Sequence, residues 1–179
     1  MNYTELSKKI SYILRHNPHE YGLLLDKGGW VDLEALISAL KVLEQYKKLD
    51  VADIENMMIH TSKKRHEIHM GRIRALYGHT LKERIEKKPA QPPEILFHGT
   101  SRASAEKIFK EGLSSKGRQY VHLSPEKKTA YIVGKRKDNN PIVLVIDAKY
   151  AWSAGILFYP GNEYTWLSES IPAKFIREC

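Results

Sequence analysis

The first part of the chain has the hydrophobic spacing of an amphipathic helix. Apolar side chains recur there at intervals of three and four residues, which places them on one helix face. These residues are Leu6, Ile10, Ile13 and Leu14. Thr4 is a candidate N-cap. Pro18 predicts that the helix ends near Asn17, because the residue before a proline disfavours helical geometry.

Two further helices and a β-hairpin are predicted next. Asp32 is a candidate N-cap for a second helix after the break at Gly28-Gly29, and a third helix is expected over residues 51–60. Residues 65–76 then alternate on both sides of Gly71, which is typical of a hairpin. Four of its side chains are expected to face inward: Ile68, Met70, Ile73 and Ala75. Three helices followed by a hairpin is the element order of a winged helix.

The pattern changes in the second half of the chain. Residues 82–94 (KERIEKKPAQPPE) are charged and rich in proline, so we interpret them as a linker between domains 1–81 and 95–179. Strands are expected at 95–98, 120–124, 142–146, 157–159, 165–168 and 175–176, and helices after Ser101 or Ser104 and over 125–133. The chain is therefore predicted to be α+β, with a small mixed sheet in its second half.

Composition narrows the class of protein. Of 179 residues, 42% are apolar, which is enough for a packed core. The single cysteine, Cys179, allows no intramolecular disulfide, which favours a cytoplasmic setting. We see no signal-peptide segment, no apolar run of membrane-spanning length and no CxxC spacing, so neither a membrane nor a metal partner is expected. Walker, GxGxxG, HExxH and Ser/His/Asp signatures are absent as well.

The net charge of +8 is concentrated in two segments. Residues 60–88 hold nine Lys and Arg against three Glu, and residues 116–137 hold seven against one Glu, so each segment carries +6. Such segments favour a polyanionic partner. The alternative is that lysine-rich helix faces are simply solvated, and charge alone does not decide between the two interpretations.

The N-terminal half contains two candidate sites. Arg15 and His16 stand at the last turn of the first helix, off its apolar face. The alternative is that they only interact favourably with the helix dipole. The second candidate combines the segments Lys63-Lys64-Arg65, Arg72-Ile73-Arg74 and Gly78-His79-Thr80, where guanidiniums and backbone amides suit a phosphate. Its alternative is a solvated hairpin or a nonspecific contact with nucleic acid.

The C-terminal half contains two more candidate sites. His98, Gly99 and Thr100 end a strand, where glycine permits close approach of a ligand and the other two supply hydrogen bonds. In the segment GRQYVHLS, alternation places four polar side chains on one strand face: Arg118, Tyr120, His122 and Ser124. A polar face suits a ligand cleft, and the alternative is a solvated edge strand.

In this order and spacing, the motifs resemble the NAD-dependent RNA 2′-phosphotransferase family over residues 6–176. The segments that carry the resemblance are LSKKISYILRHNP, GLLLDKGGWVDLEAL, KKRHEIHMGRIRALYGHT, ILFHGT, EGL, GRQYVHLS, PIVLVIDA and TWLS. The resemblance implies an N-terminal winged-helix RNA-binding lobe and a C-terminal NAD-binding lobe related to ADP-ribosyltransferases.

The resemblance also implies a two-step reaction with NAD+ as co-substrate and no metal. An RNA 2′-phosphate attacks C1″ of the nicotinamide ribose and nicotinamide leaves, giving a 2′-phospho-ADP-ribosylated RNA. The ribose 2″-hydroxyl then attacks phosphorus, releasing 2′-OH RNA and ADP-ribose 1″,2″-cyclic phosphate. The implied RNA is tRNA-like or another RNA that carries a 2′-phosphate, as in tRNA splicing.

Site residues follow from the resemblance by position. The family's catalytic set falls on Arg15, His16, Arg65 and Arg118. Its RNA-contacting residues fall on Arg74, Gly78 and His79, and its NAD-contacting residues fall on His98, Gly99, Thr100 and His122. The chain departs from the family pattern at His66 (usually Phe), at Leu76-Tyr77 (usually Asn-Gln) and at Tyr164-Thr165.

Two other functions are consistent with parts of the sequence. A mono-ADP-ribosyltransferase acting on nucleic-acid ends, protein or a small molecule commonly needs a glutamate, and the candidates Glu163 and Glu169 do not occupy the motif position next to Trp166. A nonenzymatic winged-helix protein that binds nucleic acid would explain the first basic segment but not the HGT and GRQYVHLS segments. Nothing resembles a coiled coil, and a monomer is expected.

Overall fold

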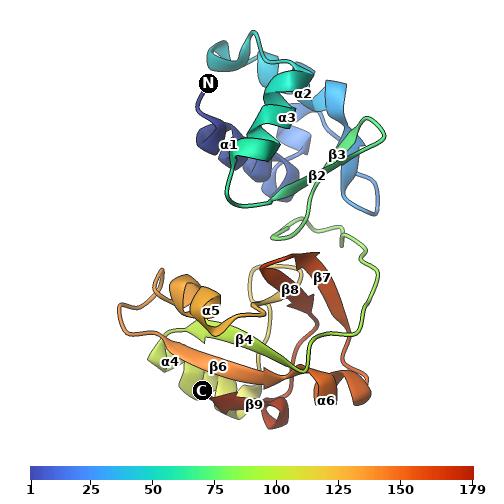
Figure 1. The fold of residues 1–179 in the computed structure, drawn as a ribbon. Coiled ribbons are helices and arrows are strands. Elements are labelled where there is room, and N and C mark those ends of the chain that lie inside the picture. The colour runs from blue at the N-terminus through green and yellow to red at the C-terminus, as the bar shows by residue number, and fades with distance from the viewer. The chain divides into compact units, whose positions relative to one another are not determined.

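The computed structural model describes all 179 residues, and the chain divides into two units, Met1–Glu86 and Lys87–Cys179 (Figure 1). The boundary lies inside the segment predicted as a linker. Ile85 is buried, and the Glu86 backbone N–H donates to the Lys27 carbonyl over 2.7 Å. On the other side, the Ala90 N–H donates to the Phe158 carbonyl over 2.9 Å. The start of this segment is therefore fixed to the first unit and its middle to the second.

The first unit contains three α-helices, two short 3-10 helices and a three-stranded sheet. Its elements are α1 (Tyr3–His16), η1 (His19–Tyr21), β1 (Trp30–Asp32), α2 (Leu33–Lys41), η2 (Glu44–Tyr46), α3 (Val51–His60), β2 (His66–His69) and β3 (Arg72–Ala75). The sheet order is β1-β3-β2, with both pairings antiparallel. The three helices and the hairpin are confirmed. The short strand β1 was not predicted, because three residues are too few to show alternation.

Side-chain caps determine where these helices begin. The predicted cap Thr4 is wrong, because Asn2 caps α1 by accepting the Glu5 N–H over 3.2 Å. Asp32 caps α2 as predicted, and Asp50 forms a reciprocal capping box with Asp53 at the start of α3.

The hairpin turn corrects one inward-facing residue. Met70 and Gly71 both have positive φ, 46° and 70°, as a two-residue hairpin turn requires. Met70 is therefore 86% exposed at the tip of the hairpin instead of facing the core. Ile73 and Ala75 are buried and Ile68 packs against the core, as predicted.

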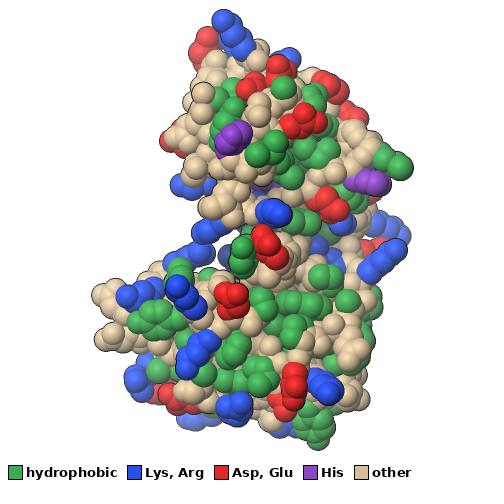
Figure 2. All heavy atoms as spheres, viewed as in Figure 1, with side chains coloured by type: hydrophobic (Ala, Val, Ile, Leu, Met, Phe, Trp, Pro, Cys, Tyr) green, Lys and Arg blue, Asp and Glu red, His purple; other side chains and the backbone are tan.

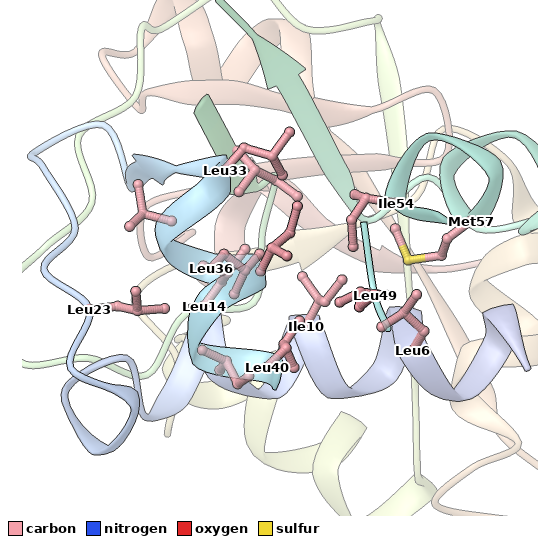
Figure 3. Packing of buried hydrophobic residues seen from close by; sticks show 14 of the residues in the cluster. Leu6, Ile10, Leu14, Leu23, Leu33, Leu36, Leu40, Leu49, Ile54 and Met57 are labelled. Carbon is pink, nitrogen blue, oxygen red and sulfur yellow. The ribbon is translucent and has the colours of Figure 1, made fainter. Parts of the chain in front are cut away.

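The core of the first unit lies among its helices (Figure 3). The four apolar residues on one face of α1 are fully buried: Leu6, Ile10, Ile13 and Leu14. They pack with Leu36 and Leu40 of α2 and with Ile54 and Met57 of α3. Burying a side chain of this size stabilises a fold by about 1.5–3 kcal/mol, so this face fixes the orientation of α1 and of the polar residues beside it.

The second unit contains three helices, a short 3-10 helix and two small sheets. Its elements are β4 (Ile95–Thr100), α4 (Arg102–Glu111), β5 (Val121–Leu123), α5 (Lys127–Gly134), β6 (Ile142–Asp147), α6 (Ala148–Ser153), β7 (Phe158–Asn162), β8 (Thr165–Ser168), η3 (Ala173–Phe175) and β9 (Ile176–Glu178). The sheet orders are β4-β6-β9 and β5-β8-β7. All pairings are antiparallel, so the predicted mixed sheet is wrong, whereas the α+β class is confirmed.

Local signals explain most of these elements. Ser101 caps α4, and Gly112, with φ of +84°, ends it. Helix α6 was not predicted, although Asp147 caps it by accepting the Tyr150 N–H over 3.2 Å. No helix in the structure is long and apolar enough to cross a membrane. On the face shown in Figure 2, Lys and Arg side chains gather around α5, part of the second basic segment.

Two glycines bring α5 against β4. A Cβ built on Gly99 of β4 would lie 1.8 Å from the Ala130 carbonyl oxygen of α5. A Cβ on Gly134 of α5 would lie 2.7 Å from the Pro141 side chain and 3.1 Å from the Gly99 carbonyl carbon. The two backbones therefore approach more closely than any other residue pair would allow.

We expect Gly99→Ala to destabilise the second unit by at least about 2 kcal/mol, because the new methyl group overlaps backbone atoms. Thermal unfolding followed by circular dichroism measures the change. The matched control is Gly117→Ala, which meets no atom within 4 Å and should change stability by less than about 0.5 kcal/mol. Equal stability of the two variants would contradict the packing argument.

A buried histidine couples the stability of the first unit to pH. His66 is 4% exposed, and its Nε2 lies 3.0 Å from the Ser11 hydroxyl oxygen. Burial, with the nearby charges of Arg15 and Arg65, lowers the pKa of His66 to about 3. An unfolded histidine has a pKa near 6.5. Between these values the unfolded chain binds a proton that the folded chain does not, so stability falls as pH falls.

We expect His66 to contribute a slope of about 1.4 kcal/mol per pH unit below pH ~6.5, down to about pH 3. Urea unfolding at several pH values measures it. His66→Phe keeps an aromatic ring without a titrating nitrogen, so its stability should depend less steeply on pH. Parallel curves for the two proteins would show that His66 is not the responsible group.

Candidate active site

The end of α1 and the loop after β3 meet in the first unit. The Thr80 N–H donates to the Arg15 carbonyl over 3.0 Å, and the Thr80 hydroxyl lies 2.8 Å from Nδ1 of His16. Arg15 is half-buried and His16 is exposed. Two motifs that are 64 residues apart in sequence thus share one corner of the unit.

Gly78 and Tyr77 hold the side chain of Arg15. The guanidinium carbon of Arg15 lies 4.8 Å from the centre of the Tyr77 ring, a cation–π distance. Gly78 has φ of +91°, and a Cβ there would lie 3.4–3.5 Å from the Arg15 side chain. The glycine is needed for its backbone conformation, and it gives the guanidinium a flat surface to lie on.

Arg65 and His66 approach α1 from the start of β2. The Nη1 group of Arg65 donates to the Ser7 hydroxyl over 3.2 Å, and the Arg65 carbonyl accepts the Leu76 N–H over 2.9 Å. Both Arg15 and Arg65 lie close enough to His66 to lower its pKa, after the larger effect of burial. Arg15 and His16 thus lie at the end of α1, and the Arg65 guanidinium contacts the same helix at Ser7.

Arg74 is held by groups on its own sheet. Its Nε and Nη2 lie 2.8 and 2.6 Å from Oε2 of Glu67, and its guanidinium carbon lies 4.4 Å from the Trp30 ring. Glu67 is the direct cross-strand partner of Arg74. This pair was missed, although a two-residue turn at 70–71 in itself predicts that positions 67 and 74 face each other.

Arg72 has a similar acidic partner. Its Nη2 lies 2.8 Å from Oδ2 of Asp26. Burial alone would raise the pKa of Asp26, but the Trp30 N–H and the Arg72 guanidinium outweigh it and lower that pKa. Arg72 and Arg74 of the first basic segment are thus paired with carboxylates.

His79, predicted to contact RNA, is buried. Only 2% of it is exposed, and a Cβ on Gly29 would lie 3.6 Å from its Nε2 and 3.2 Å from Ile85. In this structure His79 therefore packs beside Gly29.

In the second unit, two of the predicted NAD-site residues meet. Nδ1 of His98 donates to the His122 carbonyl over 2.9 Å, and Nδ1 of His122 donates to the Tyr120 carbonyl over 3.0 Å. Burial and the charge of Lys137 lower the pKa of His98, outweighing the hydrogen bond to the carbonyl, which raises it. His98 is thus neutral at physiological pH, and its Nε2 is a hydrogen-bond acceptor.

Backbone pairing explains why these histidines are adjacent. Phe97 and Ser124 exchange two hydrogen bonds of 2.8 Å, which join the middle of β4 to the end of β5. Gly99 and Thr100 follow in β4, where Thr100 is 2% exposed. The space beside Gly99, predicted for a ligand, is occupied by α5.

Arg118 lies apart from the strand on which it was predicted. Strand β5 covers only Val121–Leu123, so Arg118 sits in the preceding turn, where it is exposed. Tyr120 is buried, with its ring 5.1 Å from that of Tyr159. The predicted polar face therefore reduces to His122, with Ser124 beyond the end of the strand.

The last features of interest are a carboxylate of the second unit and groups of possible metal ligands. The Tyr159 hydroxyl donates to Glu169 over 2.8 Å, so this glutamate has a partner within its own unit. No cluster of three or more His, Cys, Asp or Glu side chains that could hold a metal ion occurs in the chain.

The chain is similar to a defined protein family along almost its whole length. Residues 2–170 match the model of the RNA 2′-phosphotransferase, Tpt1 / KptA family. A probable RNA 2′-phosphotransferase of Acetivibrio thermocellus is 50% identical over 177 residues, which cover 99% of this chain and 97% of that protein. One from Bacillus thuringiensis subsp. konkukian is 46% identical, covering 97% and 94%. The chain therefore belongs to the RNA 2′-phosphotransferase family.

Proposed function

We propose that this protein removes a 2′-phosphate from RNA by transferring it to NAD+. The observation that carries the proposal is the gathering of Arg15, His16 and Arg65 along α1, with the Thr80 loop tied to the same helix end. An internal RNA 2′-phosphate is a dianion, and two guanidiniums near one helix suit it.

Each unit has a role in this proposal. The three helices and three-stranded antiparallel sheet of Met1–Glu86 support a winged-helix lobe that binds RNA. The small antiparallel sheets of Lys87–Cys179, with the paired histidines on β4 and β5, support an ADP-ribosyltransferase-like lobe that binds NAD+.

The proposed chemistry has two displacements. A 2′-phosphate oxygen forms a bond to C1″ of the nicotinamide ribose, and the bonding electrons of the C–N bond leave with nicotinamide. The 2″-hydroxyl then bonds to phosphorus and loses its proton, while the RNA 2′-oxygen leaves and gains one. The products are 2′-OH RNA and ADP-ribose 1″,2″-cyclic phosphate.

The arginines of the first unit serve the first displacement. The Tyr77 ring and Gly78 orient Arg15, and Ser7 orients Arg65. Guanidiniums held in advance neutralise the phosphate and aim one of its oxygens, at no reorganisation cost during the reaction.

His16 serves the second displacement. Because its Nδ1 contacts the Thr80 hydroxyl, Nε2 is the nitrogen that exchanges a proton with a reacting oxygen. We assign Arg118 to the same step, because its side chain is exposed in the turn before β5 and its guanidinium donors suit the phosphoryl oxygens.

The histidines of the second unit serve nucleotide binding. Nδ1 of each ring donates to a backbone carbonyl, and Nε2 of the neutral His98 ring is an acceptor, which suits the hydroxyl groups of a ribose. Gly99 and Thr100 act indirectly, since they fix β4 beneath α5.

The proposal is tested by incubating the protein with NAD+ and a short RNA that carries one internal 2′-phosphate. We expect 2′-OH RNA, nicotinamide and the cyclic phosphate, all dependent on NAD+. A failure to remove the phosphate at high enzyme concentration would refute the proposal. Stable ADP-ribose on the RNA with the wild-type protein would instead favour an ADP-ribosyltransferase.

We expect His16→Ala and Arg118→Ala to slow the second displacement by at least about 100-fold, so that ADP-ribosylated RNA accumulates. Gel analysis of radiolabelled RNA during a single turnover measures this. Matched controls are the exposed residues His19 and Arg136, whose replacement by alanine should leave the time course unchanged. Wild-type kinetics in both site variants would show that the assignment is wrong.

A further inference from the structure

A polar stripe runs along α1 beside its apolar face. Ser7, Ser11 and Arg15 are spaced by four residues, so they lie on one line of the helix. Ser7 is 0% exposed and Ser11 is 7% exposed. Buried hydroxyls need hydrogen-bond partners, and here each hydroxyl contacts one of two consecutive residues at the start of β2, Arg65 and His66.

Each serine holds one of these residues. The Ser7 hydroxyl accepts a hydrogen bond from Nη1 of Arg65 over 3.2 Å. The Ser11 hydroxyl donates its only proton to the Ser7 carbonyl over 2.7 Å. Nε2 of His66, 3.0 Å from the same oxygen, is therefore the donor in that contact.

The result is an arginine fixed at both ends. The Arg65 carbonyl accepts the Leu76 N–H, and the ring of the next residue, His66, is buried against Ser11. Ser7 then engages one of the five N–H donors of the guanidinium. Because serine carries no charge, the guanidinium keeps its full positive charge for an anion.

We propose that Ser7 is a positioning residue that orients Arg65 toward the RNA 2′-phosphate, with the Ser11–His66 contact holding the adjacent backbone. This inference rests on the proposed function, because it takes the anion to be that phosphate. A flexible arginine would lose side-chain entropy on binding, and Ser7 reduces that cost in advance.

We expect the protein to fold without the Ser7 hydroxyl. Ser7→Ala removes one hydroxyl from α1, leaves the apolar face intact and favours the helix. The half-buried Arg65 remains able to reach water. Stability and phosphate recognition should therefore respond differently to this change.

The test is a ratio of affinities, measured by fluorescence anisotropy without NAD+. The Kd of an RNA with a 2′-hydroxyl is divided by the Kd of the same RNA with one 2′-phosphate. We expect Ser7→Ala to lower this ratio roughly five- to tenfold, with little change in the affinity for 2′-OH RNA. If Ser7 had only a structural role, Ser7→Ala would weaken the binding of both RNAs equally. Ser38→Ala, at an exposed serine of α2, is the control and should leave the ratio unchanged.

A double-mutant cycle identifies Arg65 as the partner. In an Arg65→Ala background, Ser7→Ala should cause no further loss of the ratio. The same loss in both backgrounds, or a ratio within about twofold of wild type for Ser7→Ala, would overturn the proposal. Ser7→Cys, which keeps the side-chain size but is a weak acceptor, should reproduce the loss and serves if the alanine variant does not fold.

The test of Ser7 and the test of the proposed function have separate outcomes. Turnover of 2′-phosphorylated RNA by the wild-type protein tests the function itself. If turnover occurs and the cycle is additive, only the positioning role of Ser7 is overturned.

Discussion

The hydrogen bonds between Thr80 and the last turn of α1 are the constraint on which the N-terminal candidate site depends. The carbonyl of Arg15 is one of those that a helix leaves without an internal partner, and the Thr80 N–H satisfies it. Pro18 prevents the helix from continuing, so this partner must come from elsewhere in the chain. The same loop carries Tyr77 and Gly78 to the Arg15 side chain. The same loop thus caps the end of α1 and orients Arg15.

In the second unit, the candidate residues are positioned by close backbone packing. Gly99 and Gly134 let α5 lie directly on β4, and the Phe97–Ser124 pairing draws β5 to the same strand. Burial lowers the pKa of His98, and the His122 carbonyl fixes its tautomer by accepting a hydrogen bond from Nδ1. The glycine of the HGT segment therefore faces α5, whereas the neighbouring His98 points to the other face of β4, toward β5.

Much of the fold follows from local signals in the sequence. Pro18 predicts where α1 ends, and Asp32 predicts where α2 begins. The alternation around Gly71 predicts the hairpin. The short elements β1 and α6 were not predicted, because neither is long enough to show a periodic pattern. Met70 was misplaced because its apolar side chain was given more weight than the geometry of the turn.

The candidate site was less predictable than the fold. Motifs and their order indicated which residues belong to it, but partners that arise from tertiary packing leave no local trace. Ser7 appears in the sequence as an ordinary helix residue, and only the structure shows it beside Arg65. Glu67 is the exception, since the register of the hairpin alone places it opposite Arg74.

The partners of the arginines refine the meaning of the +8 charge. Arg72 and Arg74 face carboxylates at 2.8 and 2.6 Å, which offset their charges, and the Arg74–Glu67 pair joins β3 to β2. Arg65 faces a serine hydroxyl, which directs the guanidinium and leaves its charge intact. A site for a dianionic phosphate requires oriented but uncompensated cations, because a carboxylate would compete for the same N–H donors. The chemical nature of the partner therefore separates Arg65 from Arg72 and Arg74, which a count of basic residues does not reveal.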